Sequence, residues 1–321
     1  MHADYACRHT GRCCTSGWAI PVEAPLHRAL SAALTAGRLQ VPAGSGADTP
    51  APFQDREPRP ADAAAILATH ASGACVFFDG PPANLCALQR QGGVAWLPAS
   101  CRHFPRVALL DGRGTSITLS HYCPTAARQL FRTDVPLAIT TAPAAFPSDV
   151  DYEGFDARDT WPPLLRPGVL ADLETYDIWE TRLVNTFADE TLSPEEALRR
   201  ILDVTETLRA WTPPDGPLVP RARAVCAMPA AGDAPADAAA FLRRHVAASW
   251  ALHGLAAASV PEELAPPAAT IASPAVWREH VEPAWRTFSG PVRRYLAARA
   301  FGSWLAYQGQ GLRTVAAGVT T

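Results

Sequence analysis

The sequence predicts a mainly α-helical protein with one small β-hairpin, in which an irregular cysteine-rich domain precedes a helical domain. Three observations lead to this prediction. Seven of the eight cysteines lie in the first 123 residues, a proline-rich segment covers 133–167, and apolar residues recur at helical spacing from residue 168 onward. We therefore expect a cysteine-cluster domain over 1–132, a linker over 133–167 and a helical domain over 168–321.

Composition narrows the classes of function before any motif is considered. The chain of 321 residues carries a net charge of −3 and no long run of like charges, so we expect no nucleic-acid partner. All 28 basic residues are arginine, which excludes Schiff-base chemistry on a lysine. The sequence shows no secretory signal and no apolar run of roughly 18 residues, the length of a membrane span. We expect a cytoplasmic protein with no membrane partner.

Local patterns predict the elements of the first third. Apolar spacing and a terminal Gly37 predict a helix over 21–39. Residues 41–60 are rich in Pro, Gly, Ala and Asp and predict a loop. An alanine-rich helix is expected over 61–71. Residues 75–82 (Cys-Val-Phe-Phe-Asp-Gly-Pro-Pro) predict a strand that runs into a turn.

A hairpin is the clearest β-structure signal. Strand-like segments at 107–110 (Val-Ala-Leu-Leu) and 116–119 (Ser-Ile-Thr-Leu) flank the Asp-Gly-Arg-Gly segment at 111–114, which is typical of a tight turn. Cys101 and Cys123 lie on either side of this hairpin. We therefore expect the hairpin to bring their two sulfurs together.

The remaining elements are predicted to be helices. Short ones are expected from Cys86 to Gly92 and over 124–132, and Ser193 followed by Pro194 and acidic residues is a well-formed helix start. Proline-rich segments separate the later helices. These later helices are predicted at 168–189, 194–210, 235–258, 274–288 and 291–307.

The cysteine distribution is the strongest chemical signal in the sequence. Cysteines that cluster in a protein of a reducing compartment favour metal ligation over disulfides. A disulfide framework in an exported protein is the alternative, and Cys226 is expected to be a buried free thiol. The domain over 1–132 is therefore predicted to be an irregular metal-binding domain. Its candidate ligands are Cys7, Cys13, Cys14, Cys75, Cys86, Cys101 and Cys123.

The spacing of these cysteines bears on the identity of the metal. Four thiolates suffice for a 4Fe-4S cluster or for one zinc ion, so seven imply either two centres or one centre with three sulfurs left over. Compact zinc modules usually carry two Cys-x2-Cys pairs, and this sequence has none. We therefore expect a 4Fe-4S cluster, with zinc as the alternative.

Other residues near the cysteines are candidates for secondary roles. Three histidines each lie within two residues of a cluster cysteine: His9, His103 and His121. Each is a candidate to bind the metal beside the cysteines or to donate a hydrogen bond to a ligand. The alternative is that these histidines are simply solvated. Arg102 and Arg106 flank Cys101 and are candidates for binding an anionic cofactor or balancing the charge of a thiolate cluster. Ordinary surface ion pairs are the alternative for both arginines.

Four segments, taken together, resemble a known family. They are Cys7–Cys14 (Cys-Arg-His-Thr-Gly-Arg-Cys-Cys), Cys75–Phe78, Cys86–Leu88 and Cys101–Arg106 (Cys-Arg-His-Phe-Pro-Arg). In this order they resemble the YkgJ-type cysteine-cluster family of zinc- or iron-chelating proteins. The chain departs from the family at Thr10, where a second cysteine often stands, so the early motif offers three sulfurs and needs distant partners.

A narrower resemblance is to the flagellin lysine-N-methylase family. Cys13–Ile20 (Cys-Cys-Thr-Ser-Gly-Trp-Ala-Ile) matches its motif with one inserted residue. This resemblance implies an iron–sulfur methyltransferase that uses S-adenosylmethionine and acts on lysine of a protein partner such as flagellin. No radical Cys-x3-Cys-x2-Cys motif is present, and Gly112-Arg113-Gly114 is read as turn chemistry. The alternatives are a non-catalytic metal-binding protein and a zinc-stabilised domain that supports a partner-binding helical domain.

Overall fold

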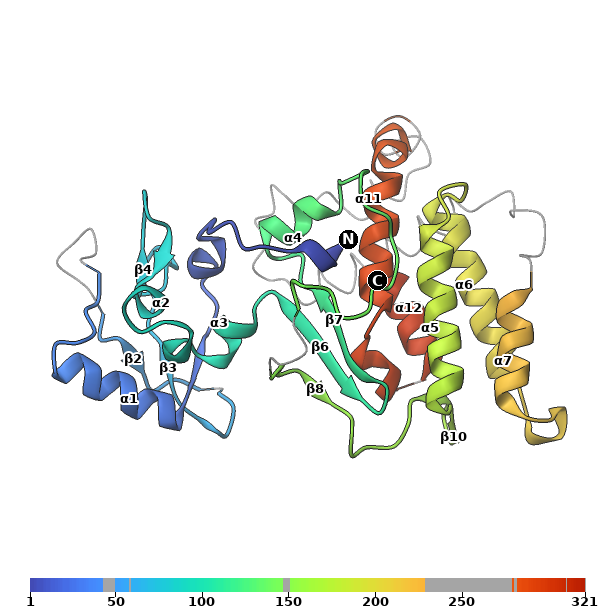
Figure 1. The fold of residues 1–321 in the computed structure, drawn as a ribbon, viewed down its shortest axis with the longest axis horizontal. Coiled ribbons are helices and arrows are strands. Elements are labelled where there is room, and N and C mark those ends of the chain that lie inside the picture. The colour runs from blue at the N-terminus through green and yellow to red at the C-terminus, as the bar shows by residue number, and fades with distance from the viewer. Residues whose placement is uncertain are drawn as a thin grey trace.

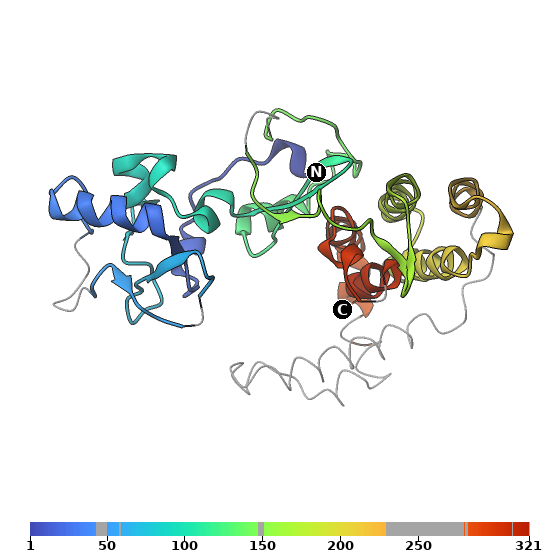
Figure 2. The same ribbon diagram turned by 90° about the horizontal axis from the view of Figure 1, so that it is seen from below.

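The computed structural model describes residues 1–42, 50–57, 59–146, 151–228, 279, 282–309 and 311–320. The molecule is elongated, with a small first lobe (residues 12–103), a central hairpin and a helical part at the far end (Figure 1). Figure 2 shows the first lobe and the helical part at opposite ends. Helices combined with small sheets confirm the coarse fold prediction. No helix in the described part of the chain has the length and hydropathy needed to cross a membrane.

A three-stranded antiparallel sheet opens the first lobe. It has the order β1 (Pro21–Glu23), β3 (Ala63–Leu67), β2 (Phe53–Gln54). Helix α1 (Ala24–Thr35) follows β1 directly, with a proline in its first turn, and ends just before Gly37, as the sequence predicts. The predicted start at residue 21 is wrong, because Pro21–Glu23 pair with β3 as strand β1.

The alanine-rich helix predicted at 61–71 is wrong, because this segment forms β3, the central strand. β3 pairs with β1 on one edge and with β2 on the other, and four of its five residues are buried. Two ladders of hydrogen bonds and burial outweigh the helical preference of alanine, which amounts to tenths of a kcal/mol per residue.

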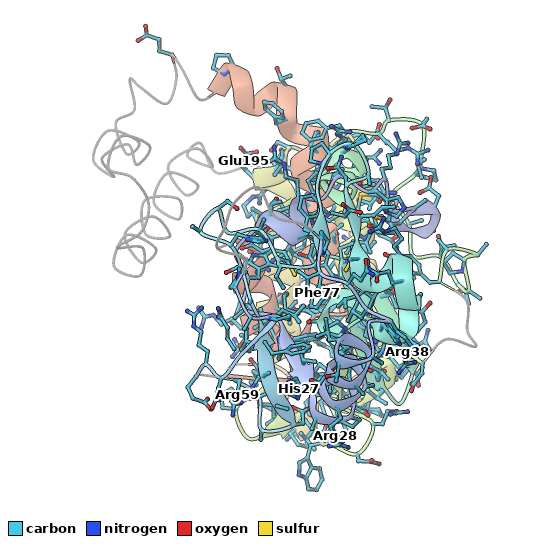
Figure 3. The ribbon with its side chains drawn as sticks, turned by 90° about the vertical axis from the view of Figure 1, so that its left-hand side faces the viewer. His27, Arg28, Arg38, Arg59, Phe77 and Glu195 are labelled. Carbon is cyan, nitrogen blue, oxygen red and sulfur yellow. The ribbon has the colours of Figure 1, made fainter. Side chains whose placement is uncertain are left out.

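The remaining elements of the first lobe are short, and Figure 3 views them from the end of the molecule, with Arg28 and Arg38 on the outside. Of the segment 75–82, predicted as a strand that runs into a turn, only Phe78 and Asp79 are in a strand, whereas the short helix after Cys86 is confirmed. The elements are η2 (Arg12–Thr15), β4 (Phe78–Asp79), β5 (Leu85–Cys86), α2 (Ala87–Gly92), η3 (Val94–Trp96) and α3 (Ala99–His103). The core that they share with α1 and β3 consists of Val22, Leu30, Ala33, Leu39, Leu67, Ala68, Val76, Phe77, Ala87, Leu88 and Leu97.

The predicted hairpin is confirmed as β6 (Arg106–Asp111) and β7 (Gly114–Leu119). The two strands pair in register from Arg106 opposite Leu119 to Asp111 opposite Gly114. Strand β8 (Phe155–Asp156) adds to β6 in parallel, so part of the segment expected to be a linker belongs to this sheet. Helix α4 (Pro124–Gln129) follows β7, and the short η1 (His2–Asp4) lies beside this region (Figure 1).

The helical part forms one hydrophobic core, in which α11 packs on α5 and α12 packs on α6. Ser193 caps α6 as predicted, since Glu196 N donates to Ser193 Oγ (3.2 Å) and Ser193 N donates to Glu196 Oε2 (2.9 Å). The elements are β9 (Leu164–Arg166), β10 (Val169–Leu170), α5 (Leu173–Ala188), α6 (Pro194–Arg209), η4 (Pro213–Asp215), α7 (Leu218–Ala227), α11 (Glu282–Ala300), η7 (Trp304–Tyr307) and α12 (Leu312–Thr320).

The predicted helix at 235–258 lies outside the described residues, as do residues 274–278, 280 and 281 of the helix predicted at 274–288, whose end lies in α11. The boundary placed before 291 is wrong, because α11 continues through Pro291; a proline removes one backbone donor, and packing of α11 on α5 supports the helix across it. Helices α7 and α12 were missed, α7 because it lies in a proline-rich stretch.

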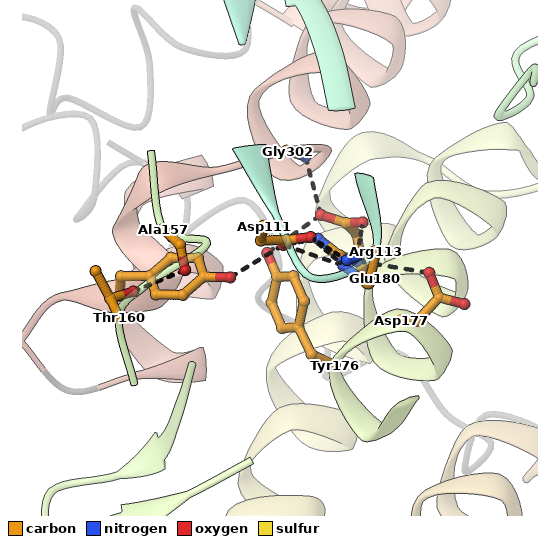
Figure 4. A network of polar contacts seen from close by, with 9 residues as sticks. Asp111, Arg113, Ala157, Thr160, Tyr176, Asp177, Glu180 and Gly302 are labelled. Carbon is orange, nitrogen blue, oxygen red and sulfur yellow. Dashed lines mark hydrogen bonds and ion pairs between the residues drawn. The ribbon is translucent and has the colours of Figure 1, made fainter. Parts of the chain in front are cut away.

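The hairpin turn is fixed to the helical part by a buried polar network (Figure 4). Arg113 Nη1 donates to Glu180 Oε2 (2.9 Å), and Arg113 Nη2 donates to Asp111 Oδ2 (2.8 Å). Glu180 also accepts bonds from Gly302 N (2.9 Å) and from the Tyr176 hydroxyl (3.1 Å). Glu180 is only 1% exposed, so these hydrogen bonds are needed to stabilise a charged carboxylate at this position.

Candidate metal centre

A tight turn presents the first two clustered thiols. Cys13 and Cys14 lie in η2, which begins after Gly11. Gly11 has φ +71°, and a Cβ on it would lie 2.7 Å from Phe78 Cζ. Only glycine combines this left-handed backbone with such a close approach. The Gly-x-Cys-Cys pattern of the sequence therefore has a physical basis: it seats the cysteine pair against β4.

Backbone hydrogen bonds bring Cys75 to this turn. Cys75 N donates to Cys14 O at 2.7 Å, and Gly17 N donates to Gly73 O at 3.1 Å. The two segments therefore run side by side, although about 60 residues separate them in the sequence.

Cys86 and Cys101 reach the same place from two further segments. Cys86 lies opposite Phe78 in the β4–β5 pair, and Phe78 N donates to Cys75 O at 2.9 Å. Cys101 lies in α3, where Ala99 N donates to Glu23 Oε1 at 2.9 Å. Cys75, Cys86 and Cys101 all pack against the core of the first lobe.

Four of the thiols lie within one another's electrostatic reach. Burial raises the pKa of Cys101, and the charges of Cys86, Cys75 and Cys13 raise it further. Burial likewise raises the pKa of Cys75 to about 11, with Cys86 and Cys13 adding to the effect, and it raises the pKa of Cys86, with Cys13 adding again. In each of the six possible pairs among these four thiols, the charge of one thiol therefore raises the pKa of the other. We call Cys13, Cys75, Cys86 and Cys101 the four-thiol set.

Cys14 lies directly beside this set. Its Sγ is 3.9 Å from Cys13 Sγ, and this contact lowers the pKa of Cys13 while it raises that of Cys14. Cys14 interacts with Cys13, Cys86 and Cys75. Cys13 is exposed and the other four thiols are half-buried. Closely grouped thiolates are stable only when a cation compensates their charge, so this group is a candidate metal site.

Cys7 and Cys123 lie in a different environment, around Tyr5. Cys123 is 6% exposed and packs in the core beneath the hairpin, and its Sγ is 3.6 Å from the Tyr5 hydroxyl. Burial raises the pKa of Tyr5, and hydrogen bonds to Cys123 and Cys7 raise it further. The seven candidate ligands are thus divided by the structure into five in the first lobe and two around Tyr5.

The hairpin joins the segments of Cys101 and Cys123, yet the two sulfurs pack against different cores. The ring of Trp18 lies between these segments, with its centroid 5.0 Å from that of Phe104 and 6.2 Å from that of Tyr122. An aromatic contact, and not a pair of sulfurs, links the two ends of the hairpin there.

The described residues contain no group of three or more His, Cys, Asp or Glu side chains placed to hold a single metal ion. Sulfurs that share one zinc ion at about 2.3 Å stand about 3.8 Å apart in a tetrahedron. The Cys13–Cys14 contact of 3.9 Å has this spacing, but no third side chain in the described part of the chain completes it.

The chain matches no protein-family model, no curated protein and no solved structure. The chemistry of this site therefore rests on its own residues.

The flanking arginines and His103 have partners within the protein. Arg102 Nη2 donates to Glu153 Oε1 at 2.6 Å, and His103 Nε2 lies 3.5 Å from the same oxygen. The guanidinium of Arg106 lies 5.6 Å above the ring of Phe146, and its Nε has no hydrogen-bond partner. Arg102 is therefore paired with Glu153, whereas Arg106 packs on Phe146.

The other histidine and cysteine candidates are dispersed. His9 is exposed, and its backbone N donates to Cys7 Sγ at 3.4 Å. Cys226 is buried on α7 in the helical core. His121 contacts His2, with 3.2 Å between the two Nε2 atoms. No local pattern indicates Tyr5 or His2 as partners, because each contacts a residue more than a hundred positions away.

Proposed function

We propose that the first lobe binds a 4Fe-4S cluster through Cys13, Cys75, Cys86 and Cys101. The observation that supports this most directly is that all six pairs of these thiols interact, although they come from four separate segments. Four cysteine thiolates are the usual ligand set of a 4Fe-4S cluster.

The sequence spacing supports a cluster over a single zinc ion, because compact zinc modules usually carry two Cys-x2-Cys pairs and this chain has none. Each ligand of a 4Fe-4S cluster binds a different iron, so its sulfurs stand farther apart than the ligands of one zinc ion. The four-thiol set comes from four separate segments of the chain, in keeping with a larger centre. Cys14, beside Cys13, is then a neighbour of the centre and not one of its four ligands.

The protein's own contribution to such a centre is to position and ionise the thiols. Burial disfavours their ionisation in the absence of a cation, so cluster binding is coupled to proton release and to the stability of the lobe. When bound, the cluster supplies one-electron chemistry. The buried apolar residues around Cys75, Cys86 and Cys101 limit water access, which tunes the potential of a centre of this kind.

Methyl transfer from S-adenosylmethionine to a protein lysine, with flagellin as the partner, is a second proposal that rests on the resemblance alone. A cluster held by four thiolates has no iron open to a further ligand. Arg102, a candidate for anion binding, is engaged by Glu153. We therefore place a non-catalytic or electron-transferring iron–sulfur protein first.

A serine scan of the cysteines tests the ligand assignment. Each cysteine is changed to serine, the full chain is purified without oxygen, and iron per chain is measured. We expect a large loss of iron for Cys13→Ser, Cys75→Ser, Cys86→Ser and Cys101→Ser. Two variants are matched controls and should keep their iron: Cys14→Ser, which lies next to the four-thiol set, and Cys226→Ser, which lies far from it. Iron loss in Cys226→Ser, or full retention in two or more of the four, would contradict the assignment.

A further inference from the structure

A pair of half-buried histidines lies outside the cysteine centre, where the N-terminal segment crosses the end of the hairpin. His2 Nε2 and His121 Nε2 are 3.2 Å apart, and the ring centroids are 5.3 Å apart at an angle of 45°. His2 lies in η1, and His121 follows β7. The two nitrogens therefore meet although 119 positions separate them in the sequence.

The hydrogen bonds around His2 fix which of its nitrogens carries the proton. The Thr118 hydroxyl has one hydrogen, and Ala298 O, which can only accept, takes it at 3.1 Å. Thr118 Oγ1 must then accept from His2 Nδ1–H, at 3.2 Å. His2 Nε2 is consequently unprotonated, with its lone pair directed at His121.

We propose that His2 and His121 form a binding site for a divalent transition-metal ion of the zinc class. Two imidazole nitrogens bound to one tetrahedral ion at 2.0–2.1 Å stand about 3.3 Å apart, close to the observed separation. The hydrogen bond from His2 Nδ1 to Thr118 is the outer contact that metal-binding histidines characteristically make. An ion at this position binds both Nε2 atoms when His121 takes its other neutral tautomer, in which the ring proton moves through solvent from Nε2 to Nδ1.

The surroundings define what kind of site this is. His2 and Thr118 line a cavity of about 80 Å³ whose lining does not include His121, so water can reach the His2 side of the pair. Among the described residues no third His, Cys, Asp or Glu side chain completes the site, and the positive charge of Arg299 acts on His121. We therefore expect the site to bind metal weakly and exchangeably, and to prefer ions that favour imidazole ligands, such as Zn²⁺, Ni²⁺ or Co²⁺.

Cobalt is the probe that tests the site, because its absorption separates nitrogen from thiolate ligands. The full chain is titrated with Co²⁺ by equilibrium dialysis, and wild type is compared with His2→Gln and His121→Gln. We expect wild type to bind one more Co²⁺ than either variant, and the difference spectrum to lack thiolate charge-transfer bands. Because only differences between variants are read, the result does not depend on what the cysteine centre binds.

Two further variants keep the test decisive. His27→Gln, whose ring packs on Phe53 in the first lobe, is the control and should bind as wild type. Thr118→Val preserves shape but removes the acceptor of His2 Nδ1–H, and it should weaken binding about 10- to 100-fold. Equal Co²⁺ binding by wild type and both histidine variants, or undiminished binding by Thr118→Val, would show that the pair is only a hydrogen bond and overturn the proposal.

Discussion

Gly11 offers a sharp test of how the first lobe positions its thiols. In Gly11→Ala the residue keeps φ +71°, which costs an L-residue about 1–2 kcal/mol. The new Cβ also lies 2.7 Å and 2.9 Å from two ring carbons of Phe78, and overpacking of this kind costs about 1–3 kcal/mol. We therefore expect a destabilisation of about 2–5 kcal/mol, enough to displace η2 and to lower the iron content of the chain.

Gly37→Ala is the matched control for this experiment. Gly37 has φ +67°, but a Cβ there meets no atom within 4 Å, so only the backbone cost applies. Thermal unfolding and iron per chain are measured for both variants, and for Gly11→Ala combined with Phe78→Leu, which should recover part of the loss. Equal stability and equal iron content in Gly11→Ala and Gly37→Ala would refute the role given to the Phe78 contact.

Two further predictions concern the buried polar groups. Glu180→Ala removes one of the two buried carboxylates that pair with Arg113, and also the acceptor of Tyr176 and Gly302 N, and should destabilise the protein by about 3–5 kcal/mol in chemical unfolding. Asp177→Ala removes a 63% exposed partner of the same arginine and should cost less than about 1 kcal/mol; equal effects would contradict the buried network. Burial lowers the pKa of His2 to about 3, so as the pH falls from about 6.5 the unfolded chain gains a proton that the folded chain does not. Stability should then decrease by up to about 1.4 kcal/mol per pH unit, and His2→Gln should flatten this dependence in urea unfolding at pH 7, 6 and 5; an unchanged slope would contradict it.

Elements governed by local chemistry were predictable from the sequence. The hairpin follows from alternating residues around Asp111-Gly112, and the start of α6 follows from Ser193 and its acidic neighbours. β3 was not predictable in this way, because alanines adopt a strand there only through pairing with β1 and β2. Local propensity is a weak determinant wherever two neighbouring strands compete with it.

The candidate site was predictable in composition but not in grouping. The sequence indicates seven clustered thiols, yet nothing in their spacing separates Cys7 and Cys123 from the others. That division depends on which hydrophobic core each segment joins. The contacts of Tyr5 with Cys123 and of His2 with His121 likewise arise from the path of the N-terminal segment across the hairpin, which no local pattern encodes.

The most direct test of the proposed centre is a metal and sulfide analysis of the full chain purified without oxygen, combined with its absorption spectrum and with electron paramagnetic resonance after reduction. A 4Fe-4S centre predicts about four iron atoms and four labile sulfides per chain, a brown colour and a signal that appears on reduction. A colourless protein with about one zinc ion and no labile sulfide would contradict the iron–sulfur assignment and leave the first lobe as a zinc site.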